Sequence, residues 1–276
     1  MSNLTLRLLT ALVALPLVIG AAWVGGWVFG VLIALSAAAA QVELYGLYRA
    51  SGARPYVALG VSVGVLASLR ALIPDAVIPA LLVGTALLVV FALTRSPEDD
   101  RPGGPLVDTA ATALGVLYPA FLAGAAVALR EADLLGMEAF WLTMTTLVGV
   151  WASDTGAYAA GRAFGKRKLF PRVSPNKTWE GAMGGVVSAI AFAALAKVTV
   201  LSGVFTWGDV AVVGLCCGAA SQLGDLAESQ LKRAAGVKDS GTWIPGHGGM
   251  LDRIDAAVIA VALVAAYAEA VRGWIA

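Results

Sequence analysis

Residues 207–230 read WGDVAVVGLCCGAASQLGDLAESQ, an apolar run whose last third turns polar. A helix needs about 20 mostly apolar residues to cross the hydrocarbon core of a bilayer, so this run is long enough to span it. Its side chains are small or aliphatic from Val210 to Leu215, whereas hydroxyl and carboxylate groups follow from Ser221 onward. The stretch therefore predicts a transmembrane helix that carries polar groups at one end.

The composition of the whole chain agrees with a membrane protein. Hydrophobic residues make up 59% of the 276 positions and charged residues 13%, and the mean hydropathy is +0.82. Soluble domains average about 45–50% apolar and roughly 25% charged residues. We predict an all-α, polytopic integral membrane protein with about nine transmembrane helices, at residues 7–24, 27–45, 56–73, 77–94, 108–129, 138–160, 179–201, 207–230 and 253–272.

The first apolar run is interpreted as a retained span rather than a signal peptide, because Pro16 interrupts it and further spans follow at once. Only Gly25 and Gly26 separate it from the second run, so the two could also form a re-entrant hairpin. All spans are expected to form a single transmembrane domain. Its N-terminal helical part covers residues 1–137, and its C-terminal catalytic part covers 138–276, where the polar motifs are concentrated.

Lys and Arg residues lie mostly on one side of the predicted spans. That side receives the N-terminus and the loops near 46–55, 95–107, 161–178 and 231–252, and the only basic residues outside it are Arg70, Arg130, Lys197 and Arg272. Cytoplasmic loops carry the excess of basic residues, so the N-terminus and the candidate site are expected in the cytoplasm and the C-terminus opposite. Short loops and the lack of a targeting extension favour a prokaryotic inner (plasma) membrane.

Several other classes of function find little support. Cys216 and Cys217 are adjacent in an apolar run and are interpreted as small packing residues rather than a disulfide or zinc site. The single histidine, His247, excludes His-rich metal or haem chemistry. The net charge of +1 does not indicate a nucleic-acid partner, and none is expected. No repeat of the kind found in inverted-repeat transporters is visible.

Carboxylates inside the predicted spans mark the candidate site. A charged group at the centre of a span costs at least ~2.5–3.5 kcal/mol, so it is a functional hypothesis by default. The polar residues at the end of the eighth span share one helical face: Ser221, Asp225, Glu228, Ser229 and Lys232. Alternatively, Asp225 or Glu228 pairs with Lys232 and neutralises the helix end. Glu43, near the cytoplasmic end of the second span, could pair with Arg49 or line the site.

The ninth span begins with Asp252 and Asp255 one turn apart. A lone Asp at this position is most often an N-cap, but several carboxylates are typical ligands of Mg²⁺, which shares them with substrate phosphates. Residues 236–249 contain five glycines, which allow close approach of the backbone to an anion. Basic residues surround this loop: Lys232, Arg233, Lys238 and Arg253. Carboxylates for a cation together with bases for phosphates indicate phosphoryl or nucleotidyl transfer.

Two further segments carry polar residues. Asp154, Tyr158 and Arg162 are spaced i, i+4 and i+8 in the sixth span, where they form either a structural Asp154–Arg162 network or a wall of the site. In the loop that follows, Thr178 can cap the seventh helix and Lys177 could meet a phosphate there. The glycine pairs 161/165 and 181/185 favour close helix packing.

Residues 229–255, SQLKRAAGVKDSGTWIPGHGGMLDRID, resemble the signature of the phosphatidate cytidylyltransferases, also called CDP-diacylglycerol synthases. The segments SDTGAY (153–158) and SPNKTWEG (174–181) resemble the same family, although Asn176 stands where a lysine is more often expected. The resemblance implies the reaction CTP + phosphatidate → CDP-diacylglycerol + pyrophosphate, in phospholipid biosynthesis. It also implies a Mg²⁺-dependent homodimer in contact with membrane lipids.

Residue roles follow from the resemblance. It implies that Asp225 and Asp252 are the metal ligands, in a two-cation centre for which K⁺ is the candidate second ion. The expected catalytic residues are Asp225, Asp252, Lys232, Arg233 and His247, and His247 either contacts a phosphate or the leaving group or braces its loop. The expected substrate-binding residues are Ser174, Lys177, Thr178, Lys238, Arg253, Asp154 and Ser229. Two alternatives stay open at this point: a related enzyme that acts on another lipid phosphate, and a transporter of anionic solutes.

Overall fold

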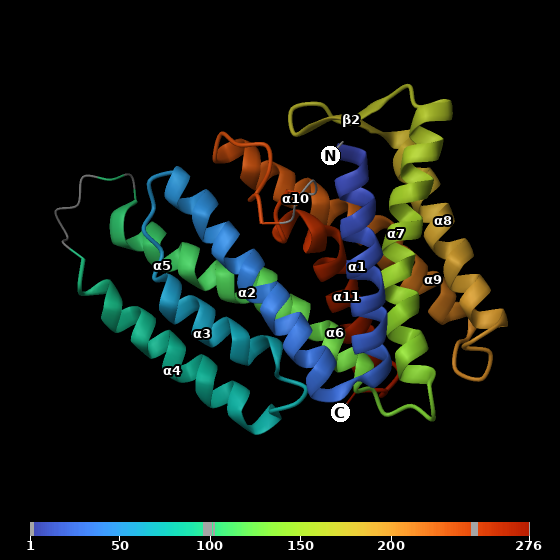
Figure 1. The fold of residues 1–276 in the computed structure, drawn as a ribbon, viewed down its shortest axis with the longest axis horizontal. Coiled ribbons are helices and arrows are strands. Elements are labelled where there is room, and N and C mark those ends of the chain that lie inside the picture. Colours follow the sequence, from blue (N-terminus) through green and yellow to red (C-terminus); the bar gives the residue numbers. More distant parts are fainter. Residues whose placement is uncertain (1–2, 96–100, 102, 244–247, 276) are drawn as a thin grey trace. The chain divides into compact units, whose positions relative to one another are not determined.

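The structure, a computed structural model, describes residues 3–95, 101, 103–243 and 248–275, and the side chains of all of these except 3–9 and 11. The described chain is mostly helical (Figure 1). Its α-helices are α1 (Asn3–Val24), α2 (Gly26–Ala50), α3 (Val57–Ser68), α4 (Pro74–Ala92), α5 (Gly104–Gly115), α6 (Leu122–Arg130), α7 (Glu138–Phe164), α8 (Trp179–Val198), α9 (Trp207–Leu215), α10 (Ser221–Ala234) and α11 (Leu251–Ala270). Two π-helical turns, η1 (Val116–Phe121) and η2 (Cys216–Ala220), join α5 to α6 and α9 to α10.

Each predicted span coincides with a helix or a continuous helical segment. The fifth span corresponds to α5–η1–α6 and the eighth to α9–η2–α10, and each of the others corresponds to one helix. A Pro inside a helix removes a backbone hydrogen bond, and Pro119 lies within η1, where a π-turn accommodates it. The helical character of the nine predicted segments is therefore confirmed for the described residues.

Within the part of the chain that the structure describes, five of these segments are long and apolar enough to cross a membrane: Gly26–Ala50, Pro74–Ala92, Gly104–Arg130, Trp179–Val198 and Trp207–Ala234. Helix α3 has 12 residues, which span only about 18 Å of a hydrocarbon core that is about 30 Å thick. On α4, Ile78, Leu82 and Val89 each expose more than half of their surface, as expected for side chains that face lipid. The chain is thus a mostly helical protein with several membrane-spanning candidates.

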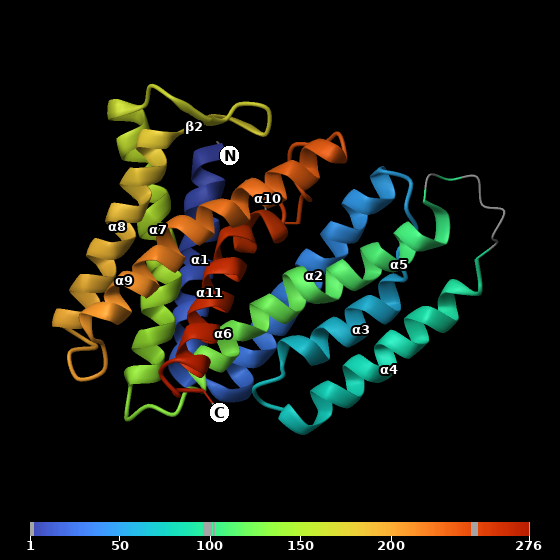
Figure 2. The ribbon, with the colours of Figure 1, turned by 180° about the vertical axis from the view of Figure 1, so that it is seen from behind.

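The prediction of an all-α chain missed one feature, a two-stranded antiparallel hairpin of β1 (Lys168–Phe170) and β2 (Ser174–Thr178). Figures 1 and 2 show it beyond the ends of α7 and α8. Its strands are short and mostly charged or polar, and β2 contains Pro175, so the sequence has no alternating apolar pattern that would predict a strand.

The chain forms two compact units, and the boundaries between them fall inside α6, α10 and α11. Unit 1 comprises residues 1–127 and 231–254, and unit 2 comprises residues 128–230 and 255–276. The expectation of one transmembrane domain stays a prediction. In unit 1, α2 packs against α1, α3, α5 and η1. Its Tyr45 is fully buried and donates a hydrogen bond to the Thr112 carbonyl (2.9 Å), which joins α2 to α5.

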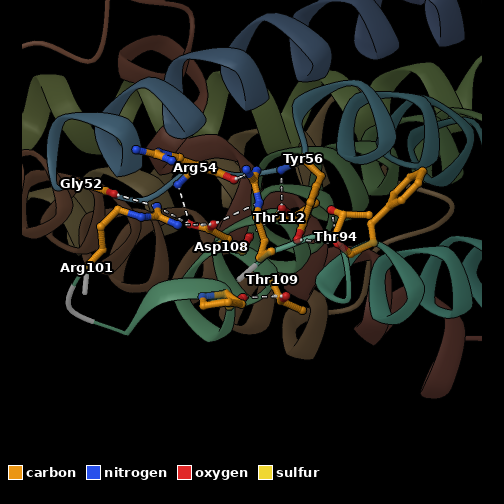
Figure 3. A network of polar contacts seen from close by, with 11 residues as sticks. Gly52, Arg54, Tyr56, Thr94, Arg101, Asp108, Thr109 and Thr112 are labelled. Carbon is orange, nitrogen blue, oxygen red and sulfur yellow. Dashed lines mark hydrogen bonds and ion pairs between the residues drawn. The ribbon is translucent and has the colours of Figure 1, made fainter. Parts of the chain in front are cut away.

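A buried carboxylate, Asp108, lies at the centre of a polar network in unit 1 (Figure 3). Asp108 in α5 has no exposed surface, and its oxygens accept hydrogen bonds from the Arg54 backbone N–H (2.5 Å) and from Arg101 Nη2 (3.0 Å). Arg95 Nε lies 3.6 Å from Asp108 Oδ2. Arg54 follows α2, whereas Arg95 and Arg101 lie between α4 and α5, so Asp108 fixes these three residues, from two connecting segments, to α5.

Unit 2 is built on the close approach of α7 and α8, which lie side by side in both views (Figure 1, Figure 2). A Cβ added at Gly181 would lie only 2.9 Å from the Ala157 carbonyl and 3.2 Å from Gly161 Cα. The prediction that these glycines serve helix packing is therefore confirmed for Gly161, Gly181 and Gly185, whereas Gly165 lies beyond the end of α7. Cys217 is buried and free, and its thiol donates to the Thr146 carbonyl (3.4 Å), so its interpretation as a packing residue is also confirmed.

Candidate functional site

Unit 2 contains a cavity of about 510 Å³ that is lined by polar residues from the sixth span, from the loop before the seventh and from the eighth. The cavity is lined by Asp154, Ala157, Tyr158, Gly161, Arg162, Asn176, Lys177, Thr178, Gly181, Ala182, Gln222 and Asp225. Four of the predicted site residues therefore line the same cavity: Asp154, Lys177, Thr178 and Asp225. We call this space the unit 2 cavity.

The start of α8 places two of these residues. Thr178 is the N-cap, and its hydroxyl accepts a hydrogen bond from the Gly181 N–H (3.1 Å), as predicted. Glu180, in the first turn, accepts hydrogen bonds from the backbone N–H groups of Lys166 (3.0 Å) and Arg167 (3.2 Å). These contacts fix the hairpin to the helix, and the hairpin in turn carries Lys177 to the cavity.

Asp225 forms the central ion pair of the unit 2 cavity. Lys177 Nζ lies 2.6 Å from Asp225 Oδ2, and Ser229 Oγ donates to Asp225 Oδ1 at 3.3 Å. The Asp225 side chain remains 37% exposed and that of Lys177 24%. Both groups are therefore accessible to a ligand, and Ser229 supports the carboxylate from one turn further along α10.

Asp154, Tyr158 and Arg162 all line the cavity, which favours the wall of a site over a purely structural network. Arg162 Nη1 donates a hydrogen bond to Tyr158 Oη at 3.1 Å. Gln222 is a lining residue that the sequence reasoning missed. Its Nε2 donates to the carbonyls of Gly218 (2.7 Å) and Ala182 (3.1 Å), so it holds α10 against α8. Its position in the sequence could have indicated this, because Gln222 is a polar residue one turn before Asp225 on the same helix.

The segment 231–254 belongs to unit 1 and contains a second polar cluster around Asp252. Lys232 Nζ lies 2.6 Å from Asp252 Oδ1. Oδ2 accepts hydrogen bonds from the Gly249 N–H (2.8 Å), the Ser240 N–H (3.0 Å) and the Ser240 hydroxyl (2.9 Å). Asp252 precedes the predicted span 253–272; burial alone would raise its pKa, but Lys232 and these N–H groups hold the pKa below its ordinary value.

Glu43 resolves an alternative that the sequence left open. Its side chain is buried, and its carboxylate accepts hydrogen bonds from the backbone N–H groups of Met250 (3.0 Å) and Leu251 (2.8 Å). Its Oε2 also lies 3.0 Å from the Ser240 hydroxyl oxygen. It therefore lies beside Asp252 in the same cluster. The signal was present in the sequence, because Glu43 is a carboxylate inside a predicted span, as Asp225 is.

The other predicted site residues occupy varied positions. Arg233, Lys238 and Arg253 are exposed, so their charges can reach a phosphate ligand. Ser174 lies in β2 and is not among the described residues that line the unit 2 cavity. Asp255 is buried, and its Oδ1 accepts a hydrogen bond from the Ala256 N–H (2.7 Å). His247 lies outside the described residues.

The carboxylates fit a divalent cation by their chemistry. Asp225 offers partly exposed anionic oxygens beside a cavity. Both carboxylate oxygens of Asp252, in contrast, already have partners within the protein, at Lys232, Ser240 and Gly249. Among the described residues, no cluster of three or more His, Cys, Asp or Glu side chains could enclose an ion. Mg²⁺ rarely needs such a cage, because it takes one or two carboxylates and completes its shell with water and substrate phosphates.

Comparison with known proteins agrees with these features. A family model described as the cytidylyltransferase family matches residues 5–271. The phosphatidate cytidylyltransferase of Brucella suis is 37% identical over 269 residues, which cover 95% of this chain and 92% of the relative. Proteins of the same name are 36% identical in Pseudomonas aeruginosa, over 97% of each chain, and 31% identical in Synechocystis, over 94% of each chain. The chain therefore belongs to the cytidylyltransferase family.

Proposed function

We propose that the chain transfers the cytidylyl group of CTP to phosphatidate, which forms CDP-diacylglycerol and releases pyrophosphate in phospholipid biosynthesis. The observation that carries this proposal is the unit 2 cavity, where Asp225, Lys177 and Arg162 face the same open space. These groups provide a ligand for a cation and two positive charges for phosphates. The names of the curated relatives support the choice of phosphatidate and of a cytidylyl donor.

The proposed reaction is an in-line displacement at phosphorus. An oxygen of the phosphatidate phosphate forms a bond to the α-phosphorus of CTP, and the bond from that phosphorus to the pyrophosphate oxygen breaks. The attacking phosphate is already anionic near neutral pH, so the reaction needs no strong general base. Catalysis then depends on positioning the two phosphates and on neutralising their charge.

The basic residues divide into two groups by unit. Lys177 and Arg162 line the unit 2 cavity, whereas four others lie in the segment 231–254 of unit 1: Lys232, Arg233, Lys238 and Arg253. We assign both groups to the phosphates of CTP and phosphatidate. Ser174, Thr178, Asp154 and Ser229 are proposed to bind substrate or orient these charges, and His247 to contact a phosphate or brace its loop.

Asp225 and Asp252 are proposed to hold Mg²⁺, with K⁺ as the candidate second cation. When bound, such a cation supplies positive charge at the phosphates that react. Lys177 and Lys232 each neutralise one of these carboxylates at 2.6 Å. We expect each lysine to turn toward a phosphate when its carboxylate binds the cation.

The proposed setting is the inner (plasma) membrane, with nine spans, the N-terminus and the active site in the cytoplasm, and the C-terminus on the opposite side. The five long apolar segments and the bias of Lys and Arg toward one set of loops support this arrangement. A homodimer in contact with membrane lipids is also proposed, because the resemblance of residues 229–255 implies it.

The decisive test is pyrophosphate release by detergent-purified protein supplied with CTP, Mg²⁺ and phosphatidate, with each component omitted in turn. We expect release only when all three are present, with CDP-diacylglycerol as the second product. A panel of other lipid phosphates, including polyprenol phosphate, tests the choice of acceptor. Release with another member of the panel but not with phosphatidate would keep the nucleotide chemistry and reject the acceptor.

A further inference from the structure

Glu43 caps a helix that lies far from it in the sequence. Helix α11 begins at Leu251, and the N–H groups at the start of a helix have no partner within the helix. Glu43 Oε1 accepts a hydrogen bond from the Met250 N–H, and Oε2 accepts one from the Leu251 N–H. The positive end of the helix dipole also favours an anion at this position. One buried side chain of α2 therefore fixes where α11 starts.

Two glycines of the loop before α11 make room for the Glu43 carboxylate. A Cβ added at Gly241 would lie 2.5 Å from Glu43 Oε1, and a Cβ added at Gly249 would overlap Oε2. These glycines therefore serve the approach of the loop to Glu43. This contact explains part of the glycine content of residues 236–249, for which the sequence suggested only a role in binding anions.

Ser240 connects Glu43 to Asp252. Its hydroxyl oxygen lies 3.0 Å from Glu43 Oε2 and 2.9 Å from Asp252 Oδ2. A hydroxyl group has one proton, so it can donate to only one of the two carboxylates at a time. The Gly249 N–H, which immediately precedes the N–H groups that Glu43 holds, also donates to Asp252. The side chain and the backbone segment that bond Asp252, at Ser240 and Gly249, are thus the same ones that Glu43 contacts, at Ser240 and at the adjacent Met250 and Leu251.

We infer that Glu43 is a positioning residue for cytidylyl transfer: through Ser240 and the backbone of residues 249–251 it sets the position of the Asp252 carboxylate. This inference rests on the proposed function, in which Asp252 belongs to the catalytic machinery. Glu43 itself touches no reacting atom on this account, because both of its oxygens are engaged by the protein.

The test is Glu43→Gln, which keeps the size of the side chain but turns an NH₂ group toward an N–H donor. We expect kcat for pyrophosphate release to fall about 100-fold, as for other displacements of a catalytic group by about 1 Å. The KM for CTP should stay within about 3-fold, because the basic residues that bind phosphates are unchanged. Hydrogen exchange at the Met250 and Leu251 amides should accelerate.

Asp108→Asn is the matched control, because Asp108 is also a buried carboxylate of unit 1 but its contacts are with Arg54, Arg95 and Arg101. It should leave kcat of the folded protein unchanged. The inference is overturned if folded Glu43→Gln retains the wild-type kcat, or if Asp108→Asn loses as much.

Ser240→Ala is the second variant in case Glu43→Gln does not fold. It removes only the hydroxyl link and should lower kcat about 10-fold, as the loss of an outer hydrogen bond to a catalytic ligand does. An unchanged kcat would contradict the inference. If wild-type protein releases no pyrophosphate with any lipid phosphate, the proposed function fails. Amide exchange then decides the positioning role alone, and unaltered exchange at residues 250 and 251 in Glu43→Gln would reject it.

Discussion

Lys177 Nζ lies 2.6 Å from Asp225 Oδ2 on the wall of the unit 2 cavity, and this contact joins the hairpin to α10. Both side chains keep substantial exposed surface, so solvent screens their attraction. An exposed ion pair of this kind stabilises a fold by only about 0–1 kcal/mol. Its value to the protein is therefore chemical, since it places a group that can bind a cation next to a group that can bind a phosphate.

Asp225→Asn should separate the contribution of this ion pair to catalysis from its contribution to stability. We expect pyrophosphate release to fall about 10²–10³-fold, as for the loss of one electrostatic group from an active site. The free energy of unfolding should change by less than about 1 kcal/mol, because the pair is partly exposed. Turnover and thermal unfolding in the same detergent measure both quantities. Asp75→Asn, at an exposed position in the first turn of α4, is the control and should retain full turnover.

Asp252→Asn should behave differently, because Asp252 is more deeply engaged. Its Oδ2 accepts three hydrogen bonds, and its Oδ1 pairs with Lys232. An asparagine would turn an NH₂ group toward one of these donors, which costs about 1–3 kcal/mol of stability. We expect turnover to be abolished while the protein stays folded. An active Asp252→Asn enzyme would remove Asp252 from the list of metal ligands.

Removal of divalent cations gives a third prediction. Chelation by EDTA should stop pyrophosphate release, and added Mg²⁺ should restore it, because the phosphates need a counter-charge that lysines alone do not supply. The Mg²⁺ concentration for half-maximal turnover should rise in Asp225→Glu, which moves the carboxylate by one methylene. Turnover that persists in EDTA would contradict the magnesium assignment.

The nine helical segments were predictable because apolar length is a local property of the chain. The hairpin of β1 and β2 was not, since its strands are held by Glu180 and by backbone contacts with α8 rather than by an apolar pattern. The thiol of Cys217 and the glycines within α7 and α8 (Gly161, Gly181 and Gly185) pack as expected, because small residues in a span have few roles other than packing.

Glu43 shows where sequence reasoning reached its limit. A carboxylate inside a predicted span indicates a functional role, and this holds for Glu43 as for Asp225. It does not indicate which residue the carboxylate contacts. The partners of Glu43 lie about 200 positions later in the chain, at Ser240, Met250 and Leu251. No local pattern links residues at that separation. Only the structure shows that Glu43 contacts the loop before α11 and the start of that helix.

Gly181→Ala tests the packing of α7 against α8. The added methyl group would lie 2.9 Å from the Ala157 carbonyl and 3.2 Å from Gly161 Cα, both backbone atoms that cannot move alone. We expect a loss of about 1–3 kcal/mol in the free energy of unfolding, as for other overpacked sites. Gly46→Ala is the control, because nothing lies within 4 Å of its added methyl group. Alanine should stabilise α2 there by roughly 0.5–1 kcal/mol. Equal stability of the two variants would contradict the close approach of the helices.

Thr178 combines two roles that its substitutions can separate. Its hydroxyl caps α8 by accepting from the Gly181 N–H at 3.1 Å, and its side chain lines the unit 2 cavity. Thr178→Ala should cost about 1 kcal/mol of stability through the lost cap. If the hydroxyl also binds CTP, the KM for CTP should rise about tenfold, which corresponds to about 1.4 kcal/mol. Thr178→Ser keeps the hydroxyl and should restore both quantities. A variant that loses the cap but keeps the wild-type KM would limit Thr178 to its structural role, because the two measurements respond to different bonds of the same oxygen.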